Sequence, residues 1–154
     1  MTPWLRQQPT ITLDLAIQGM QAALDLAKGL NVRVSLVILD GAGTPIHTAH
    51  MDGAPRPSQA IALNKALTAA GFGTSTSEWS DRLQRCSSAV QTGLPLQPGM
   101  ALFGGGEPFL LDGLVIGAIG VSGASETNDC LCAKAAVKRL SDLLSNTPAT
   151  LPEK

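Results

Sequence analysis

The sequence contains no tyrosine and few aromatic or charged residues. Aromatic side chains make up 3% of the 154 residues, and charged ones make up 15%. The formal net charge is -1, and no basic stripe is present, which argues against a nucleic-acid partner. A chain rich in alanine, leucine, isoleucine and valine, with 16 glycines, predicts tight packing of helices on a sheet. Such a composition also leaves apolar surface for subunit contacts, so we expect a homo-oligomer.

Long apolar runs are missing as well. No segment approaches the length that crosses a bilayer, and residues 1–9 contain no apolar stretch of signal-peptide length. The three cysteines, Cys86, Cys130 and Cys132, are an odd number without a disulfide framework. They also lack the second pair that a zinc site needs. The sequence therefore predicts a cytoplasmic protein with reduced thiols and no membrane partner.

Length and apolar periodicity predict one domain over residues 1–154, with a core from about 10 to 144 and frayed termini. Helical spacing predicts about four helices, over residues 12–29, 58–70, 75–86 and 125–144. In the third of these, Ser75 and Glu78 have capping-box spacing. Strand patterns occur over residues 32–39 and 45–51 and, as about three strands, within 100–122. Residues 93–99 are expected to form a loop. This order predicts an α+β domain with a central, largely antiparallel sheet of about five strands.

Glycine marks the segment from residue 100 to residue 129. Gly104-Gly105-Gly106 opens it, and Asp112-Gly113 is a strong turn signal between two apolar strands. Gly117 and Gly120 interrupt the second strand, which indicates a bulge or the close approach of another backbone or a ligand. The glycine spacing matches neither a dinucleotide-binding nor a phosphate-binding loop.

Four further motifs in the chain form a recognisable set. They are Met51-Asp52-Gly53-Ala54-Pro55, Asn64-Lys65-Ala66, Phe103-Gly104-Gly105-Gly106-Glu107-Pro108 and Gly117-Ala118-Ile119-Gly120-Val121-Ser122-Gly123. Together they resemble the GlcG/HbpS family, which includes the carboxy-terminal domain of PduO-type proteins. They occur in the family's order, and the resemblance covers about Thr10 to Leu144. It implies a profilin-like fold, oligomers, haem binding or association with corrinoids, and a place in a catabolic operon. At position 50, where the family commonly has arginine, this chain has His50.

Histidine and aspartate end the predicted return strand. His50, two residues before Asp52, is a candidate for an axial haem ligand, for a general base or for a hydrogen-bonded strand residue. Side chains alternate along a strand, so His47 is expected on the opposite face. The two histidines therefore make a poor metal pair.

Lys65 and Glu107 are the other candidates. Lys65 lies in an alanine-rich helix, where a lysine must reach solvent, form an ion pair or serve a site. With Arg56 it could hold haem propionates or a small carboxylate. Glu107 follows three glycines whose backbone N–H groups could face a ligand. It could act as a base, pair with Lys65 or lie exposed beyond a tight turn.

The leading hypothesis is a small-molecule-binding protein whose ligand is haem or a related tetrapyrrole, with His50 on the haem iron. The ligand-binding residues would be His50, Asp52, Arg56, Lys65, Gly104, Gly105, Gly106 and Glu107, around one pocket. The alternative is a small catabolic enzyme acting on a carboxylic acid. Lys65 and Arg56 would then bind the acid, and Glu107 or His50 would move a proton. A third possibility is an assembly partner without pocket chemistry, and the sequence does not decide whether the protein is an enzyme.

Overall fold

The computed structural model describes residues 2–148, which form an α+β domain around one antiparallel sheet. The strands are β1 (Ser35–Asp40), β2 (Pro45–His50), β3 (Gly106–Leu111) and β4 (Leu114–Ser122). The α-helices are α1 (Leu13–Gly29), α2 (Ser58–Phe72), α3 (Trp79–Gln84), α4 (Ser88–Gly93) and α5 (Glu126–Asn146). Two 3-10 turns are η1 (Thr76–Glu78) and η2 (Leu94–Leu96). Part of the expectation of frayed termini falls on residues 1 and 149–154, which lie outside the described residues.

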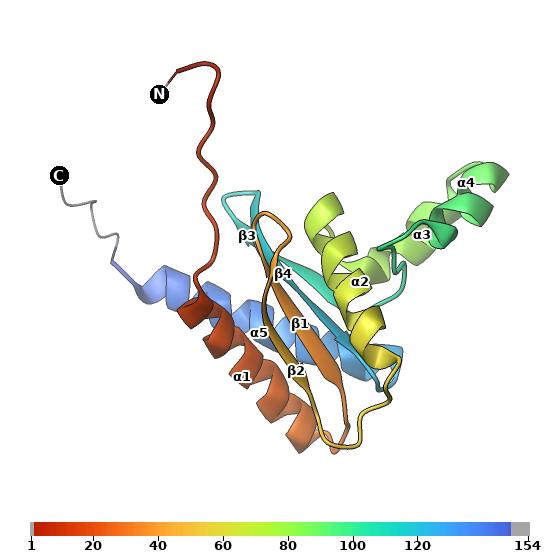
Figure 1. The fold of residues 1–154 in the computed structure, drawn as a ribbon, viewed down its shortest axis with the longest axis horizontal. Coiled ribbons are helices and arrows are strands. Elements are labelled where there is room, and N and C mark those ends of the chain that lie inside the picture. Colours follow the sequence, from red (N-terminus) through yellow and green to blue (C-terminus); the bar gives the residue numbers. More distant parts are fainter. Residues whose placement is uncertain (1, 149–154) are drawn as a thin grey trace.

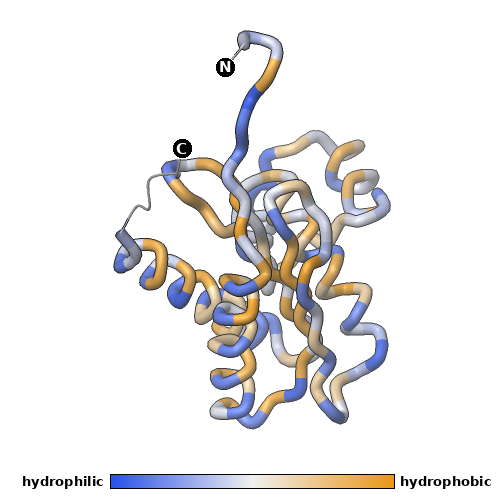
Figure 2. The backbone as a smooth tube through the Cα atoms, turned by 60° about the vertical axis from the view of Figure 1, so that its left-hand side comes forward, coloured by the Kyte–Doolittle hydropathy of each residue, from blue (hydrophilic) through white to orange (hydrophobic). Residues whose placement is uncertain are grey.

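The strand order is β2-β1-β4-β3, so β2 and β3 form the two edges of the sheet (Figure 1). Helices α1 and α5 cover one face, where the larger apolar core lies, and α2 covers the other. The helices alternate between hydrophobic and hydrophilic residues, as helices with one face on a core do (Figure 2). None of the helices within residues 2–148 is long and apolar enough to span a membrane.

Local signals in the sequence place several of these elements. The side chain of Thr12 accepts a hydrogen bond from the N–H of Leu15 and starts α1. Ser125 does the same for Asn128 at the start of α5. Asp112, with φ +50°, and Gly113 form the turn between β3 and β4. These three predictions are confirmed.

Glycines in β4 let other backbone segments approach closely. A Cβ at Gly120 would collide with the carbonyl oxygen of Ala62 and lie 2.7 Å from the nitrogen of Ala66. A Cβ at Gly117 would lie 2.6 Å from the carbonyl oxygen of Leu39. The predicted close approach is therefore made by α2 and β1, and α2 lies in backbone contact with the sheet.

Two predictions about element number are wrong. Within residues 2–148 the sheet has four strands rather than five, because N–H groups of the segment before β3 donate to helix side chains instead of to a further strand. There, the N–H of Ala101 donates to Thr68 Oγ1 at 2.9 Å, and that of Gly104 donates to Glu126 Oε1 at 2.7 Å. Residues 2–148 contain five α-helices rather than four, since α4 forms over residues 88–93, between the predicted third helix and the expected loop, and η2 occupies part of that loop. Together with α3, α4 projects from the body of the domain (Figure 1).

Candidate functional site

The predicted site residues fall into three separate places. His50 and Asp52 lie at the end of edge strand β2, and Lys65 is inside the domain on α2. Glu107 lies on β3, at the other edge of the sheet. Arg56 is exposed in the loop before α2. One pocket that gathers all of these residues does not form within residues 2–148.

Lys65 is buried, with 1% of its surface exposed, and its donors have partners inside the chain. Its Nζ donates to the carbonyl oxygen of Val121 at 2.8 Å and to Asp129 Oδ2 at 3.0 Å. It also lies 4.9 Å from the ring centroid of Phe103. An ammonium has three N–H groups, and the two hydrogen bonds together with the contact to the aromatic ring account for all three. Of the predicted alternatives, Lys65 takes the ion pair, and its partner is Asp129 rather than Glu107.

The environment of Asp129 shifts the pKa of its carboxyl group in two opposing directions. Burial raises its pKa, while the charge and hydrogen bond of Lys65 and the backbone N–H groups of Ala124 and Gly123 act to lower it. The pair thus ties α2, β4 and the start of α5 together at one point.

The triple glycine serves packing in this structure. The N–H of Gly104 donates to Glu126, and that of Gly106 donates to Thr76 Oγ1 at 2.8 Å, so both are engaged within the chain. Gly105 has φ +122°, and a Cβ there would lie 2.8 Å from Lys65 Nζ. A Cβ at Gly106 would lie 2.5 Å from the carbonyl oxygen of Lys65. The glycines therefore let the loop lie against α2 and α5.

Glu107 faces away from Lys65 because successive strand residues point to opposite sides of the sheet. Gly106 faces α2, whereas Glu107 faces the side covered by α5 and is buried. Its Oε2 accepts a hydrogen bond from Ser75 Oγ at 2.5 Å. The predicted capping role of Ser75 is wrong, since its side chain makes no cap bond.

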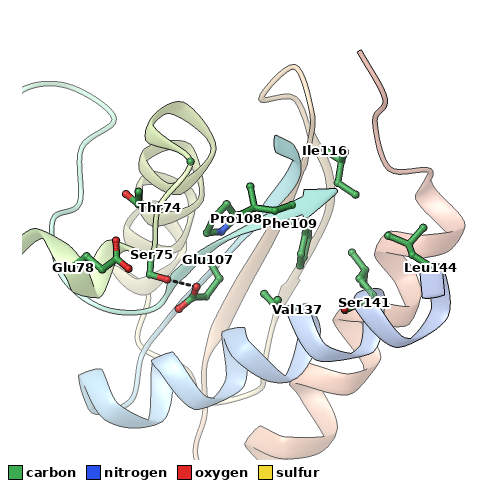
Figure 3. A pocket seen from close by; sticks show the side chains of 13 residues that line it. Thr74, Ser75, Glu78, Glu107, Pro108, Phe109, Ile116, Val137, Ser141 and Leu144 are labelled. Atoms are coloured by element: carbon green, nitrogen blue, oxygen red, sulfur yellow. Dashed lines mark hydrogen bonds between the residues drawn. The ribbon is translucent and has the colours of Figure 1, made fainter. Parts of the chain in front are cut away.

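The environment of Glu107 raises the pKa of its carboxyl group above the ordinary value. Burial raises the pKa of its carboxyl group, the Ser75 hydrogen bond and the charge of Lys134 lower it, and Glu78 raises it again. Glu107 lines a cavity of about 310 Å³ between η1, β3 and α5 (Figure 3). A buried carboxyl group in a cavity is the usual setting of a binding or acid–base residue.

His50 ends a chain of hydroxyl groups. Ser35 is its partner in the β1–β2 pairing, and Ser35 Oγ lies 2.6 Å from His50 Nδ1 and 2.8 Å from Ser58 Oγ. The hydroxyl of Ser58 donates to the carbonyl oxygen of Pro55 at 2.5 Å, so it accepts from Ser35. Ser35 has then used its only proton and accepts from His50 Nδ1–H. This assigns the proton to Nδ1 and leaves Nε2 as a free acceptor on an exposed side chain.

Two grooves meet at His50. One, of about 400 Å³, lies between β2 and α2 and is lined by Ser35, Leu36, Val37, Pro45, Thr48, Ala49, His50, Gln59, Ala60 and Leu63. The other, of about 300 Å³, contains the cations Lys28 and Arg33 beside Asp52. Arg56 lines neither groove.

Sequence reasoning missed four residues around His50. Lys28 and Arg33 come from the end of α1 and from the segment before β1, and only the fold brings them to β2. Ser35 and Ser58 were missed although one signal existed. In an antiparallel hairpin around residues 40–45, Ser35 stands opposite His50.

Cys86, Cys130 and Cys132 are free thiols. Within residues 2–148, no group of three or more histidine, cysteine, aspartate or glutamate side chains could hold a metal ion. Burial raises the pKa of Cys132 to about 11, so its thiol stays protonated at neutral pH. Burial also raises the pKa of Cys130.

Comparison with known families and proteins gives consistent matches over most of the chain. A family model described as haem degrading protein HbpS-like matches residues 11–138. A 15.0 kDa protein of Citrobacter freundii, encoded in the dhaT-dhaS intergenic region, is 38% identical over 138 residues. This match covers 90% of this chain and 97% of that protein. The corrinoid adenosyltransferase PduO of Salmonella typhimurium is 36% identical over 120 residues, 78% of this chain, but only 36% of PduO is covered.

Solved structures show the same fold. Klebsiella pneumoniae protein ORFY aligns with a TM-score of 0.84 and 34% identity, over 92% of this chain and 97% of that chain. A Streptomyces reticuli HbpS double mutant aligns with a TM-score of 0.80 and 31% identity, over 90% and 92%. The complex of PduOC with heme aligns with a TM-score of 0.77 and 34% identity, over 84% and 94%.

Proposed function

The chain belongs to the HbpS-like family, and on this premise we propose that it binds haem or a related tetrapyrrole at His50. The observation that carries the proposal is the hydroxyl chain through Ser35 and Ser58, which leaves His50 Nε2 free beside two grooves. A solved relative, PduOC, forms a complex with heme, which supports this ligand class.

The residues around His50 fit such a ligand. Neutral imidazole is a usual ligand of haem iron, and an acceptor on its other nitrogen fixes the tautomer and ring orientation. The apolar side chains of Val37 and Leu63 would contact the ring, and Lys28 and Arg33 would pair with propionates. When bound, haem supplies a redox-active iron centre.

The family resemblance implies arginine at position 50, so iron ligation by His50 would be particular to this chain. For the predicted set as a whole, we propose that His50 and Asp52 border the ligand. Lys65 and the three glycines support the fold instead, because the Lys65 ammonium and the N–H groups of Gly104 and Gly106 are engaged inside it and Gly105 packs against Lys65.

A haemin titration of the purified protein tests this proposal. We expect a saturable shift of the Soret band in the wild type, and a loss of at least tenfold in affinity for His50→Ala. His47→Ala is the matched control, because it removes the chain's other histidine, which is paired with Ile38 on the opposite face. Equal titrations of the wild type and His50→Ala would exclude His50 as the ligand.

The resemblance carries further proposals: a profilin-like fold, a catabolic operon and a homo-oligomer. The proposal of a cytoplasmic location rests instead on the three cysteines without a disulfide framework. The exposed leucines around the β3–β4 turn, Leu110, Leu111 and Leu114, support subunit contacts. Sedimentation equilibrium tests the oligomer, and a monomer at micromolar concentration would contradict it.

The alternative of an enzyme for a carboxylic acid finds less support. Lys65, its proposed acid-binding residue, donates inside the chain, and Arg56 is exposed in a loop. Glu107, its proposed proton carrier, lies in a cavity of its own.

A further inference from the structure

Glu107 carries a carboxylate oxygen that no described group satisfies. The residue is only 6% exposed, and Ser75 donates to its Oε2. Its Oε1 is buried and has no hydrogen-bond partner within residues 2–148. Nearly all buried side-chain polar atoms in proteins are hydrogen-bonded. Oε1 is therefore a buried acceptor that lacks a donor from the described chain.

The cavity beside Glu107 has a polar end and an apolar end (Figure 3). Ser75, Glu78 and Glu107 form the polar end, while Phe109 and Val137 line the apolar part. Its volume of about 310 Å³ equals that of roughly ten water molecules. This size and shape suit a small molecule that has one polar group and a short hydrocarbon tail.

The charges at the polar end of the cavity determine whether the polar group of the ligand should be cationic or anionic. Glu107 and Glu78 both line the cavity, so an anionic ligand would meet two carboxylates. Lys134 on α5 is the cation whose charge acts on Glu107, but it forms no ion pair with it within residues 2–148. An ionised Oε1 accepts hydrogen bonds and gains most from a charged donor.

We propose that this cavity binds a small aliphatic amine as its ammonium ion. The nitrogen donates to Glu107 Oε1, and the tail lies along Phe109 and Val137. The site is separate from the haem proposal, since it lies at edge strand β3 whereas His50 lies at edge strand β2. A failure of either proposal leaves the other standing.

Binding of the ammonium depends on pH through Glu107. The groups around its carboxyl are Ser75 and Glu78 before α3, and Cys130 and Lys134 on α5. Burial raises the pKa of Glu107, and a bound cation acts in the opposite direction. Amine affinity therefore falls as the pH drops and Glu107 takes up a proton.

Isothermal titration calorimetry at pH 7.5 with propylammonium, butylammonium and hexylammonium tests the site. We expect one saturable site per chain, with affinity rising about fourfold for each added CH₂ until the cavity is full. Glu107→Gln keeps the shape but removes the charge, and should weaken hexylammonium binding at least tenfold. His50→Ala should leave this binding unchanged.

Neutral and anionic probes of the same length check the assignment to an amine. Hexanol and hexanoate should bind at least tenfold more weakly than hexylammonium. Hexanol binding as tightly as hexylammonium, unchanged binding to Glu107→Gln, or no saturable heat with any amine would each overturn the proposal. Should Glu107→Gln fail to fold, Val137→Phe fills the apolar end instead. Wild-type amine affinity in that variant would also overturn the proposal.

Discussion

The ion pair of Lys65 with Asp129 is the residue-level contact with the largest predicted effect on stability. Removing one member of a buried pair leaves the other charge unpaired, so Lys65→Met should lower the free energy of unfolding by about 3–5 kcal/mol. Urea unfolding measures this change. Lys138→Met is the control, because its pair with Asp142 is 78% and 53% exposed and is worth at most about 0.5 kcal/mol.

A double variant separates the charge effect from packing. Lys65→Met with Asp129→Leu removes both charges, and we expect it to be more stable than Lys65→Met alone. A double variant that is less stable than the single one would mean that the backbone contacts of Asp129, rather than the charge pair, dominate.

Glu107 makes the stability of the fold depend on pH. Its folded pKa lies above its ordinary value of 4.5, so the folded chain binds the proton more tightly than the unfolded chain. Its contribution to stability is therefore greatest at low pH and falls as the pH rises from 4.5 through the folded pKa. Glu107→Gln should lose this part of the slope. Denaturation curves between pH 4 and pH 8 measure it, with Asp142→Asn as the exposed control.

If haem binds at His50 as proposed, Ser35 should affect haemin affinity through its contact with His50. Ser35→Ala removes the acceptor of Nδ1–H, so the imidazole loses its fixed tautomer and orientation. We expect a loss of about 10–100-fold in haemin affinity, while His50→Ala loses at least as much. The titration that tests His50 also measures this effect. An unchanged affinity in Ser35→Ala would show that the hydroxyl chain does not orient the ligand.

At the scale of elements, the contact of α2 with β4 depends on Gly120. A Cβ there collides with the backbone of α2, so Gly120→Ala should cost about 1–3 kcal/mol or more. Gly71→Ala in the same helix is the matched control, because a Cβ at Gly71 meets nothing within 4 Å. Alanine there should stabilise by about 0.5 kcal/mol, since it lowers the entropy of the unfolded chain. Thermal unfolding of both variants should therefore shift in opposite directions.

Elements that depend on local signals were predictable from the sequence. Thr12 and Ser125 cap their helices with bonds to residues three positions ahead, and Asp112-Gly113 needs only its own turn. Ser75 has the same local pattern, yet its hydroxyl bonds to Glu107, 32 residues away. A capping motif indicates which local hydrogen bond a side chain can make, but it does not indicate whether a group from a distant segment competes for that side chain.

At the scale of the whole molecule, the α3–α4–η2 segment, residues 79–96, is the least integrated helical part of the described chain. Trp79 is its only buried residue, and α4 buries none. Backbone hydrogen bonds there open without the loss of much core, so amides of α4 should exchange much faster than those of α5. Hydrogen–deuterium exchange with mass spectrometry measures this. Equal protection of both helices in solution would show that a second copy or another partner covers the segment.

The sequence by itself determined the α+β class, the hairpins and four of the helices, because these depend on apolar periodicity, caps and turns between near neighbours. It also singled out His50, Lys65 and Glu107 as residues that needed an explanation. Only the tertiary structure decided that Asp129 pairs with Lys65 and that Ser75 bonds to Glu107. These partners come from distant segments, and sheet alternation sends Gly106 and Glu107 to opposite faces. The spacing of residues along the chain indicates only the pairing of Ser35 with His50, through the hairpin that joins their strands.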